Sequence, residues 1–180
     1  MRWAVAMLLL SGAAQADPLG ANDYAAMFEE YADQVVTDAG GARALERDDG
    51  VTVYETIDGD TRLYAGVDFH KGGPVGCLTS FYAETLSFVQ ACPDLAPTPN
   101  PEHLARLLVF YAENAAPPAD PAVLKARFDA LVAQHSDQIT QCVPNSVMID
   151  YAKVLMGEGA DELFDTVLAT PRLPVTQPCP

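Results

Sequence analysis

The chain has 180 residues, of which 25 are acidic and 10 are Lys or Arg, so its formal net charge at pH 7 is −15. Such a surface repels phosphate backbones and anionic lipid headgroups, so we expect neither nucleic acid nor a membrane surface as a partner. The length suits one domain with a substantial hydrophobic core.

The first sixteen residues have the pattern of a cleaved secretory signal. Arg2 provides a positive charge, residues 3–10 (WAVAMLLL) are apolar throughout, and Ala14-Gln15-Ala16 offers small residues at a cleavage site. Eight apolar residues form only about 12 Å of helix, whereas a bilayer core needs about 30 Å. We therefore predict a signal peptide at 1–16 and a periplasmic or secreted domain at 17–180, with no membrane insertion after cleavage. A buried amino-terminal helix is the alternative.

Cleavage would change the composition of the mature chain. Loss of Arg2 leaves 9 basic against 25 acidic residues, a net charge of −16, and loss of Trp3 removes the only tryptophan. Carbohydrate-binding surfaces and many protein interfaces rely on tryptophan faces. A carbohydrate-binding module is therefore disfavoured.

The amino-terminal third predicts a helix followed by a hairpin. Asn22 and Asp23 can cap a helix over 24–37, and Gly40-Gly41 would end it. The segments 51–57 and 61–69 are rich in β-branched and aromatic residues, and Asp58-Gly59 between them fits a type I′ turn. In the second strand one face is apolar, and we expect it to pack on helices or other strands; its residues are Leu63, Ala65, Val67 and Phe69.

From residue 78 onward the spacing of apolar residues predicts helices. One covers 78–91, two begin at Asn100-Pro101 and Asp120-Pro121, and the second of these reaches Ile139. Asn145 or Ser146 caps the next helix, which continues to Met156, and Asp161 opens a short last helix before Pro171. Residues 170–180 form a proline-rich tail. The fold class is mainly α with one β-hairpin (α+β), a compact helical domain stapled by disulfides.

Four cysteines, Cys77, Cys92, Cys142 and Cys179, lie after the predicted signal. An even number in an oxidising compartment predicts two disulfides, and the spacings match no zinc-ligand pattern. A helix over 78–91 would separate Cys77 from Cys92 by about 22 Å, far beyond the roughly 7 Å of a bridged pair. Each must therefore pair with Cys142 or Cys179, and each bridge should contribute about 3–4 kcal/mol.

The loop His70-Lys71-Gly72-Gly73 is the most unusual local feature. Two side chains that can carry positive charge and flexible backbone N–H groups could together hold a carboxylate or phosphate. The loop faintly resembles the His-Gly-Gly oxyanion loops of esterases, but the chain has no Gly-x-Ser-x-Gly nucleophile motif. Glycines after a hairpin are also ordinary turn residues, and this structural interpretation competes with the binding one.

The sequence offers no local metal signature, and we expect no cofactor. His70, His103 and His135 are not paired at ligand spacing on one helical face. We expect His135 in the core and His103 in solvent. The acidic pair Asp58 and Asp60 invites calcium, but the EF-hand pattern fails.

Two functional hypotheses follow. The favoured one is an exported, soluble, non-catalytic module that binds an unknown protein or small ligand. The alternative is a small exported hydrolase that uses His70 with a carboxylate and a hydroxyl assembled by the fold. A hydroxyl within about 3.2 Å of His70 in a concave pocket would favour the enzyme. A His70 side chain that points into solvent beside an exposed apolar patch would favour the binding module.

Overall fold

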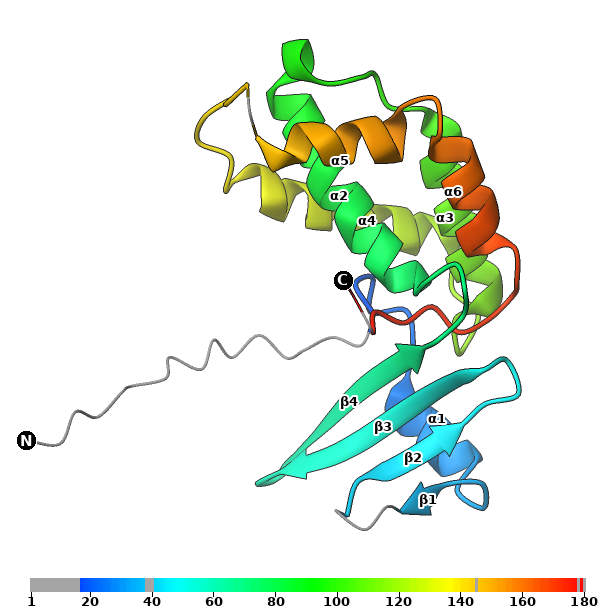
Figure 1. The fold of residues 1–180 in the computed structure, drawn as a ribbon. Coiled ribbons are helices and arrows are strands. Elements are labelled where there is room, and N and C mark those ends of the chain that lie inside the picture. The colour runs from blue at the N-terminus through cyan, green and yellow to red at the C-terminus, as the bar shows by residue number, and fades with distance from the viewer. Residues whose placement is uncertain (1–16, 38–40, 145, 178, 180) are drawn as a thin grey trace, which may run out of the picture.

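The computed structural model describes residues 17–37, 41–144, 146–177 and 179, and the predicted signal at 1–16 lies outside them. A four-stranded antiparallel sheet lies against the short helix α1, and five helices form a second layer (Figure 1). In chain order the elements are α1 (Tyr24–Glu30), β1 (Val36–Thr37), β2 (Arg43–Glu46), β3 (Val51–Asp58), β4 (Thr61–Asp68), α2 (Val75–Ala91), the 3-10 turn η1 (Pro93–Leu95), α3 (Pro101–Asn114), α4 (Pro121–Ser136), α5 (Val147–Met156) and α6 (Ala160–Leu168).

The sheet is larger than the single hairpin expected from the sequence. Its strands follow the order β1-β2-β3-β4, and all neighbours are antiparallel. The predicted helix over 24–37 was wrong in its second half, because α1 ends at Glu30 and Val36–Thr37 pairs with β2. β-branched residues lose side-chain freedom in a helix and fit a pleated strand, and pairing with β2 decides this segment.

The hairpin between β3 and β4 forms where it was expected, with a different turn. Asp58 pairs with Thr61, so Gly59 and Asp60 are its two central residues. Gly59 has φ +61°, and no described residue other than glycine has a positive φ. A type I′ turn needs positive φ at both central positions, so this detail of the prediction was wrong.

One face of the sheet is covered, and it is the opposite of the face that we expected on β4. The covered side chains of the strands pack on α1 and the carboxyl-terminal tail; this cluster contains Met27, Phe28, Leu45, Val51, Val53, Leu173 and Val175. On β4, Tyr64, Gly66 and Asp68 face this cluster, whereas Leu63 on the other face is 39% exposed.

Contacts from distant segments explain this reversal. Tyr64 stacks on Tyr24 with ring centroids 5.7 Å apart. The tail side chain of Val175 lies directly over Gly66, where a Cβ atom would collide with it. Hydropathy alone chooses the apolar face for burial, but here a ring stack, a glycine and an ion pair of Asp68 with Arg172 occupy the covered face.

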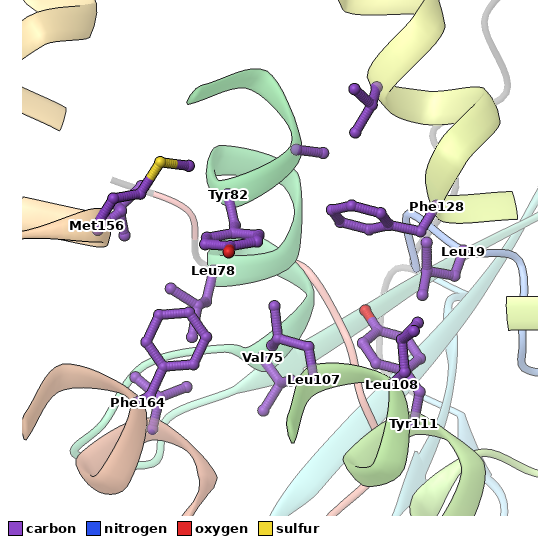
Figure 2. Packing of buried hydrophobic residues seen from close by; sticks show 14 of the residues in the cluster. Leu19, Val75, Leu78, Tyr82, Leu107, Leu108, Tyr111, Phe128, Met156 and Phe164 are labelled. Carbon is purple, nitrogen blue, oxygen red and sulfur yellow. The ribbon is translucent and has the colours of Figure 1, made fainter. Parts of the chain in front are cut away.

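The second layer consists of α2 to α6 around one hydrophobic cluster. Tyr82 on α2 lies near its centre, with ring centroids 6.2 Å from Phe128 and 5.6 Å from Phe164 (Figure 2). α2 runs through this layer and contacts α4, α5 and α6. The helix therefore has buried residues along its whole length, and it begins at Val75, before the predicted position 78.

The predicted helix starts are confirmed where a capping side chain was identified. Asn100, Asp120 and Ser146 each accept a hydrogen bond from a backbone N–H of the first turn. α4 ends at Ser136, so Ile139 lies outside it, and α6 begins at Ala160, next to the predicted Asp161. Asn145, the other proposed cap, is outside the described residues.

The two disulfides confirm the predicted exclusion of a local bridge. Cys77 is bonded to Cys179 and Cys92 to Cys142. Ahead of Cys179, the tail lies beside β4: the N–H of Asp68 donates to the carbonyl of Gln177 at 2.7 Å, and Gln177 donates back to Gly66 at 3.2 Å. The tail is thus an integral part of the fold. Within the described residues, no helix combines the length and apolarity needed to cross a bilayer.

Candidate functional site

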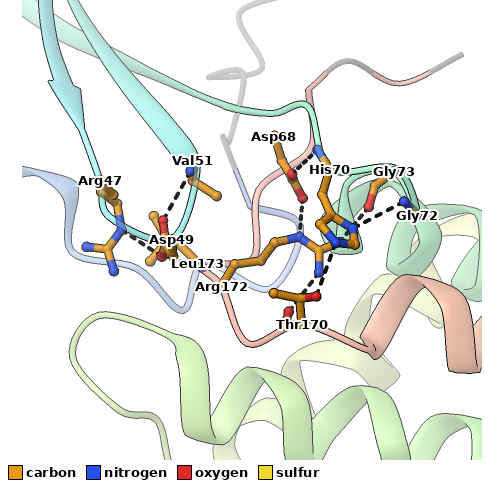
Figure 3. Close-up of polar contacts among 10 residues, drawn as sticks. All are labelled: Arg47, Asp49, Val51, Asp68, His70, Gly72, Gly73, Thr170, Arg172 and Leu173. Atoms are coloured by element: carbon orange, nitrogen blue, oxygen red, sulfur yellow. Dashed lines mark hydrogen bonds and ion pairs between the residues drawn. The ribbon is translucent and has the colours of Figure 1, made fainter.

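The predicted loop His70-Lys71-Gly72-Gly73 connects β4 to α2, where the two layers meet (Figure 3). Beside it, the Arg172 guanidinium lies fully buried, with its Nε 2.6 Å from a carboxylate oxygen of Asp68. The two other nitrogens of Arg172 donate to the carbonyls of Thr170 and Gly73, both at 2.8 Å. Arg172 therefore holds the last residue of the loop, the tail and β4 together.

The ring of His70 uses both of its nitrogens. Nδ1 lies 3.2 Å from the N–H of Gly72, and Nε2 lies 3.1 Å from the hydroxyl of Thr170. A backbone N–H can only donate, so Nδ1 accepts and a neutral ring carries its proton on Nε2. The ring is then the donor to the Thr170 hydroxyl.

The direction of the hydrogen bond between His70 and Thr170 argues against the hydrolase alternative. Asp68, His70 and Thr170 do lie together, and the distance from His70 to a hydroxyl is the expected one. A general base, however, must accept the proton of the hydroxyl that it activates, and here the nitrogen nearest Thr170 is a donor. Asp68 accepts the backbone N–H of His70 at 2.7 Å, not a ring nitrogen. The hollows beside β2, beside α1 and along the helices α2 to α4 are lined by other residues.

The backbone N–H groups of this loop, which could have bound an anion, already donate to other atoms of the protein. The N–H of Gly72 binds His70 Nδ1, and the N–H of Gly73 donates to the carbonyl of His70 at 2.8 Å. An anion would have to replace these bonds. Gly73 has φ +81°, and a Cβ on Gly72 would lie 2.7 Å from the Thr166 carbonyl oxygen, so both glycines meet backbone requirements of the fold. Lys71 is exposed, and its ammonium makes no ion pair within the described part of the chain.

The other two histidines lie outside this loop, and both differ from the expectation. His103 was expected in solvent but is 2% exposed, because its ring stacks on Phe164 at 4.3 Å and its Nε2 binds Asp161 at 2.8 Å. His135, expected in the core, is only half-buried at the end of α4. Among the described residues, no group of three His, Cys, Asp or Glu side chains is placed to hold a metal ion.

The most distinctive surface is the uncovered face of the sheet, which we call the outer sheet face. One row of directly paired residues crosses all four strands: Val36, Ala44, Tyr54 and Ala65. Thr52, Thr56, Leu63 and Val67 flank this row on the same face, by the register. Phe69, directly after β4, extends the same face along this strand and has 77% of its area exposed. No described helix lies over this face (Figure 1).

Charges surround the outer sheet face but do not enter its centre. Four exposed carboxylates stand at the ends of its strands and in the adjoining turns, and none makes an ion pair with another described residue; they are Glu46, Asp48, Asp58 and Asp60. The surface is therefore an uncharged, largely apolar centre with an acidic rim. Exposed antiparallel faces usually alternate to polar residues, so this composition is unusual for a face in contact with water.

Sequence reasoning found part of this surface and assigned it a different role. The apolar residues of β4 were identified, but as core residues. Val36 and Ala44 were missed because β1 and β2 are short and only their pairing with β3 identifies them as strands. The alternation in VTVYET was a usable signal for Tyr54, since it places Tyr54 opposite Val51 and Val53.

Comparison with known proteins adds no relative: no family model matches the chain, and neither a curated protein nor a solved structure is significantly similar to it.

Proposed function

We propose that this protein is an exported, non-catalytic binding module that docks a protein partner on its outer sheet face. The observation that carries the proposal is the outer sheet face, which is largely apolar and which no described helix covers; of its central row, Ala44 is buried at 7% exposed. Val36 is 55% exposed and Phe69 is 77% exposed. Burying such a patch against a partner provides about 25 cal/mol for each Å² of apolar surface removed from water.

The charge around this face specifies the partner. Glu46, Asp48, Asp58 and Asp60 form an acidic rim, and the chain as a whole is strongly negative. Complementary charges at a rim accelerate association and exclude partners of like charge. The partner is therefore a protein surface with an apolar centre flanked by Lys or Arg. A second copy of this chain would bring two acidic rims together, which disfavours self-association.

Export is supported by covalent chemistry. Both bridges, Cys77–Cys179 and Cys92–Cys142, need an oxidising compartment to persist. The amino-terminal pattern of a charge, an apolar run and Ala14-Gln15-Ala16 supports the same route. The hydrolase alternative has less support, because the hydroxyl nearest His70 faces a ring nitrogen that donates.

Site-specific photocrosslinking in the native host tests the docking face. A photoreactive amino acid is placed at Leu63 or Phe69, and in the matched control at Val154, an apolar position on α5 whose exposed fraction, 57%, lies between theirs. We expect an adduct with one protein from both sheet positions and none from Val154. The crosslinked peptide of that protein should contain apolar residues flanked by Lys or Arg.

The purified partner then tests the energetics. Leu63→Glu and Tyr54→Glu should each weaken binding at least about tenfold, which corresponds to 1.4 kcal/mol, while Val154→Glu should leave binding unchanged. Raised salt should slow association, because the acidic rim is exposed. Equal adducts from Val154, an adduct of the chain with itself, or a partner with an acidic contact surface would overturn the proposal.

A further inference from the structure

A second feature of the helical layer is a hollow of about 430 Å³ at the end of α2 that lies farther from the sheet. Its walls come from the second half of α2, the segment 93–99 and the first turn of α3. Leu86 and Val89 form one wall, Leu104 faces them from α3, and Tyr82 lies at the boundary with the core. The volume is in the range of small-molecule sites, about 300–1,000 Å³.

The lining of this hollow carries no charged side chain. Three other hollows contain charged side chains: Arg47 and Asp49 beside β2, Arg127 near α1, and Asp129 on α4 with Asp137 directly after it. An ion would find no counter-charge among the residues that line it. An anion would also meet the repulsion of the strongly negative chain. The uncharged lining and the negative charge of the chain therefore favour a neutral ligand over an anion.

The hollow is held open by covalent and local constraints. Cys92 ends α2 and is bonded to Cys142, which fixes one end of the 93–99 segment. Pro93, Pro99 and Pro101 restrict the backbone around it, because each proline ring fixes φ. At the other end Asn100 caps α3 through its side chain and accepts the Tyr82 hydroxyl through its carbonyl at 3.3 Å. Such a site exists before a ligand arrives.

A few polar groups reach this hollow. Gln90 and Thr98 stand at its exposed margin, and the Tyr82 hydroxyl is at its inner boundary. The Tyr82 hydroxyl is neutral at physiological pH even with the ordinary tyrosine pKa near 10, and burial raises this pKa further, to about 12. An apolar cavity with a small number of polar groups is the usual composition of a site for small organic molecules.

We propose that the uncharged hollow between α2, the segment 93–99 and α3 binds a small, neutral, mainly apolar organic molecule. This site is separate from the outer sheet face and does not depend on the docking function proposed there. The occupant has one or two hydrogen-bonding groups, which meet Gln90 and Thr98 at the margin.

A pair of fluorescent probes with the same ring skeleton tests both the site and its charge preference. N-phenyl-1-naphthylamine is neutral, and 8-anilinonaphthalene-1-sulfonate carries a sulfonate. The full disulfide-bonded protein should bind the neutral probe saturably and one to one, and the sulfonate at least about tenfold more weakly, a difference of 1.4 kcal/mol. Absence of saturable binding of the neutral probe, or equal binding of the sulfonate, would overturn the proposal.

Variants locate the bound probe. Ala96→Phe fills the hollow, and Ala169→Phe adds the same bulk at an exposed position after α6. Ala96→Phe should reduce affinity for the neutral probe at least about tenfold, and Ala169→Phe should not change it. Leu86→Glu, which places a charge in the wall, gives a second test if Ala96→Phe does not fold.

Leu63→Glu on the outer sheet face should leave probe binding intact. Loss of binding in Leu63→Glu, or wild-type binding in a folded Ala96→Phe or Leu86→Glu, would place the probe elsewhere and reject the site.

Discussion

Asp68 on β4 and Arg172 in the tail form an ion pair with 2.6 Å between oxygen and Nε, and their side chains are 1% and 0% exposed. The pair lies between the sheet layer and the helical layer. Its remaining hydrogen-bonding capacity is used by His70, Thr170 and Gly73, so neither charge is left without partners. A buried pair repays its desolvation only under such conditions.

Removal of one member of this pair should therefore be costly. Arg172→Met leaves the Asp68 carboxylate buried without its counter-charge, and we expect a loss of about 3–5 kcal/mol in the free energy of unfolding. Urea denaturation at pH 7 with intact disulfides measures this loss. Asp68→Asn combined with Arg172→Met should cost less than the sum of the two single changes. A loss near the 0–1 kcal/mol typical of exposed pairs would contradict the burial described here.

The approach of the tail to β4 predicts a steric effect at Gly66. A Cβ at this position would lie 2.7 Å from Cβ of Val175, so Gly66→Ala must displace the tail. We expect a destabilisation of about 1–3 kcal/mol, and Val175→Ala in the same chain should cancel part of it. Thermal unfolding compares the variants. Gly159→Ala is the control, because nothing lies within 4 Å of its new Cβ and its φ is −87°. Equal effects at both glycines would show that Val175 does not limit the space at Gly66.

The two disulfides should differ in their contribution to stability. Cys77–Cys179 closes a separation of 102 residues and Cys92–Cys142 one of 50. Loop entropy assigns them about 4.7 and about 4 kcal/mol. Replacement of each pair by serine, followed by urea denaturation, measures these values. Peptide mapping without reductant should recover the two linked pairs, and a Cys77–Cys92 peptide would contradict the fold of α2.

Local signals in the sequence predicted the helices well. Helix capping is local, because each capping side chain binds the first turn of its own helix. Neighbouring residues alone therefore predict the helix starts at Asn100, Asp120 and Ser146. The strands of the sheet were predicted less well. β1 is only two residues long and depends on β2 for its identity, so the run Val35-Val36-Thr37 could be assigned to the preceding helix.

The candidate surfaces depended on contacts that the sequence does not reveal. Alternation along β4 separated its two faces correctly, but the tail decides which face is covered, through Arg172 and Val175 more than 100 residues away. Likewise, the burial of His103 depends on Asp161 and Phe164 in α6. The loop at His70 was singled out from its composition, and only its hydrogen bonds show that its backbone donors are already engaged.

Buried tyrosines make the stability of this fold sensitive to alkaline pH. Burial raises the pKa of Tyr82 to about 12 and that of Tyr111 well above its ordinary value, with the Asp17 carboxylate adding to the effect on Tyr111. A tyrosine in the unfolded chain ionises near pH 10. Between the two values the unfolded chain loses a proton that the folded chain keeps, so the unfolded state is favoured as pH rises.

We therefore expect the free energy of unfolding to be constant with respect to these tyrosines below pH 10 and to fall as the pH rises through 12. Tyr82→Phe should reduce the slope of this fall, because it removes one of the groups that retain a proton on folding. The control replaces Tyr151, which is 39% exposed on α5, with Phe and should keep the wild-type slope. Urea denaturation at pH 9, 10 and 11 checks both variants. If Tyr82→Phe has the slope of the wild type, the Tyr82 hydroxyl is open to solvent and the inner boundary of the uncharged hollow is wetter than its contacts imply.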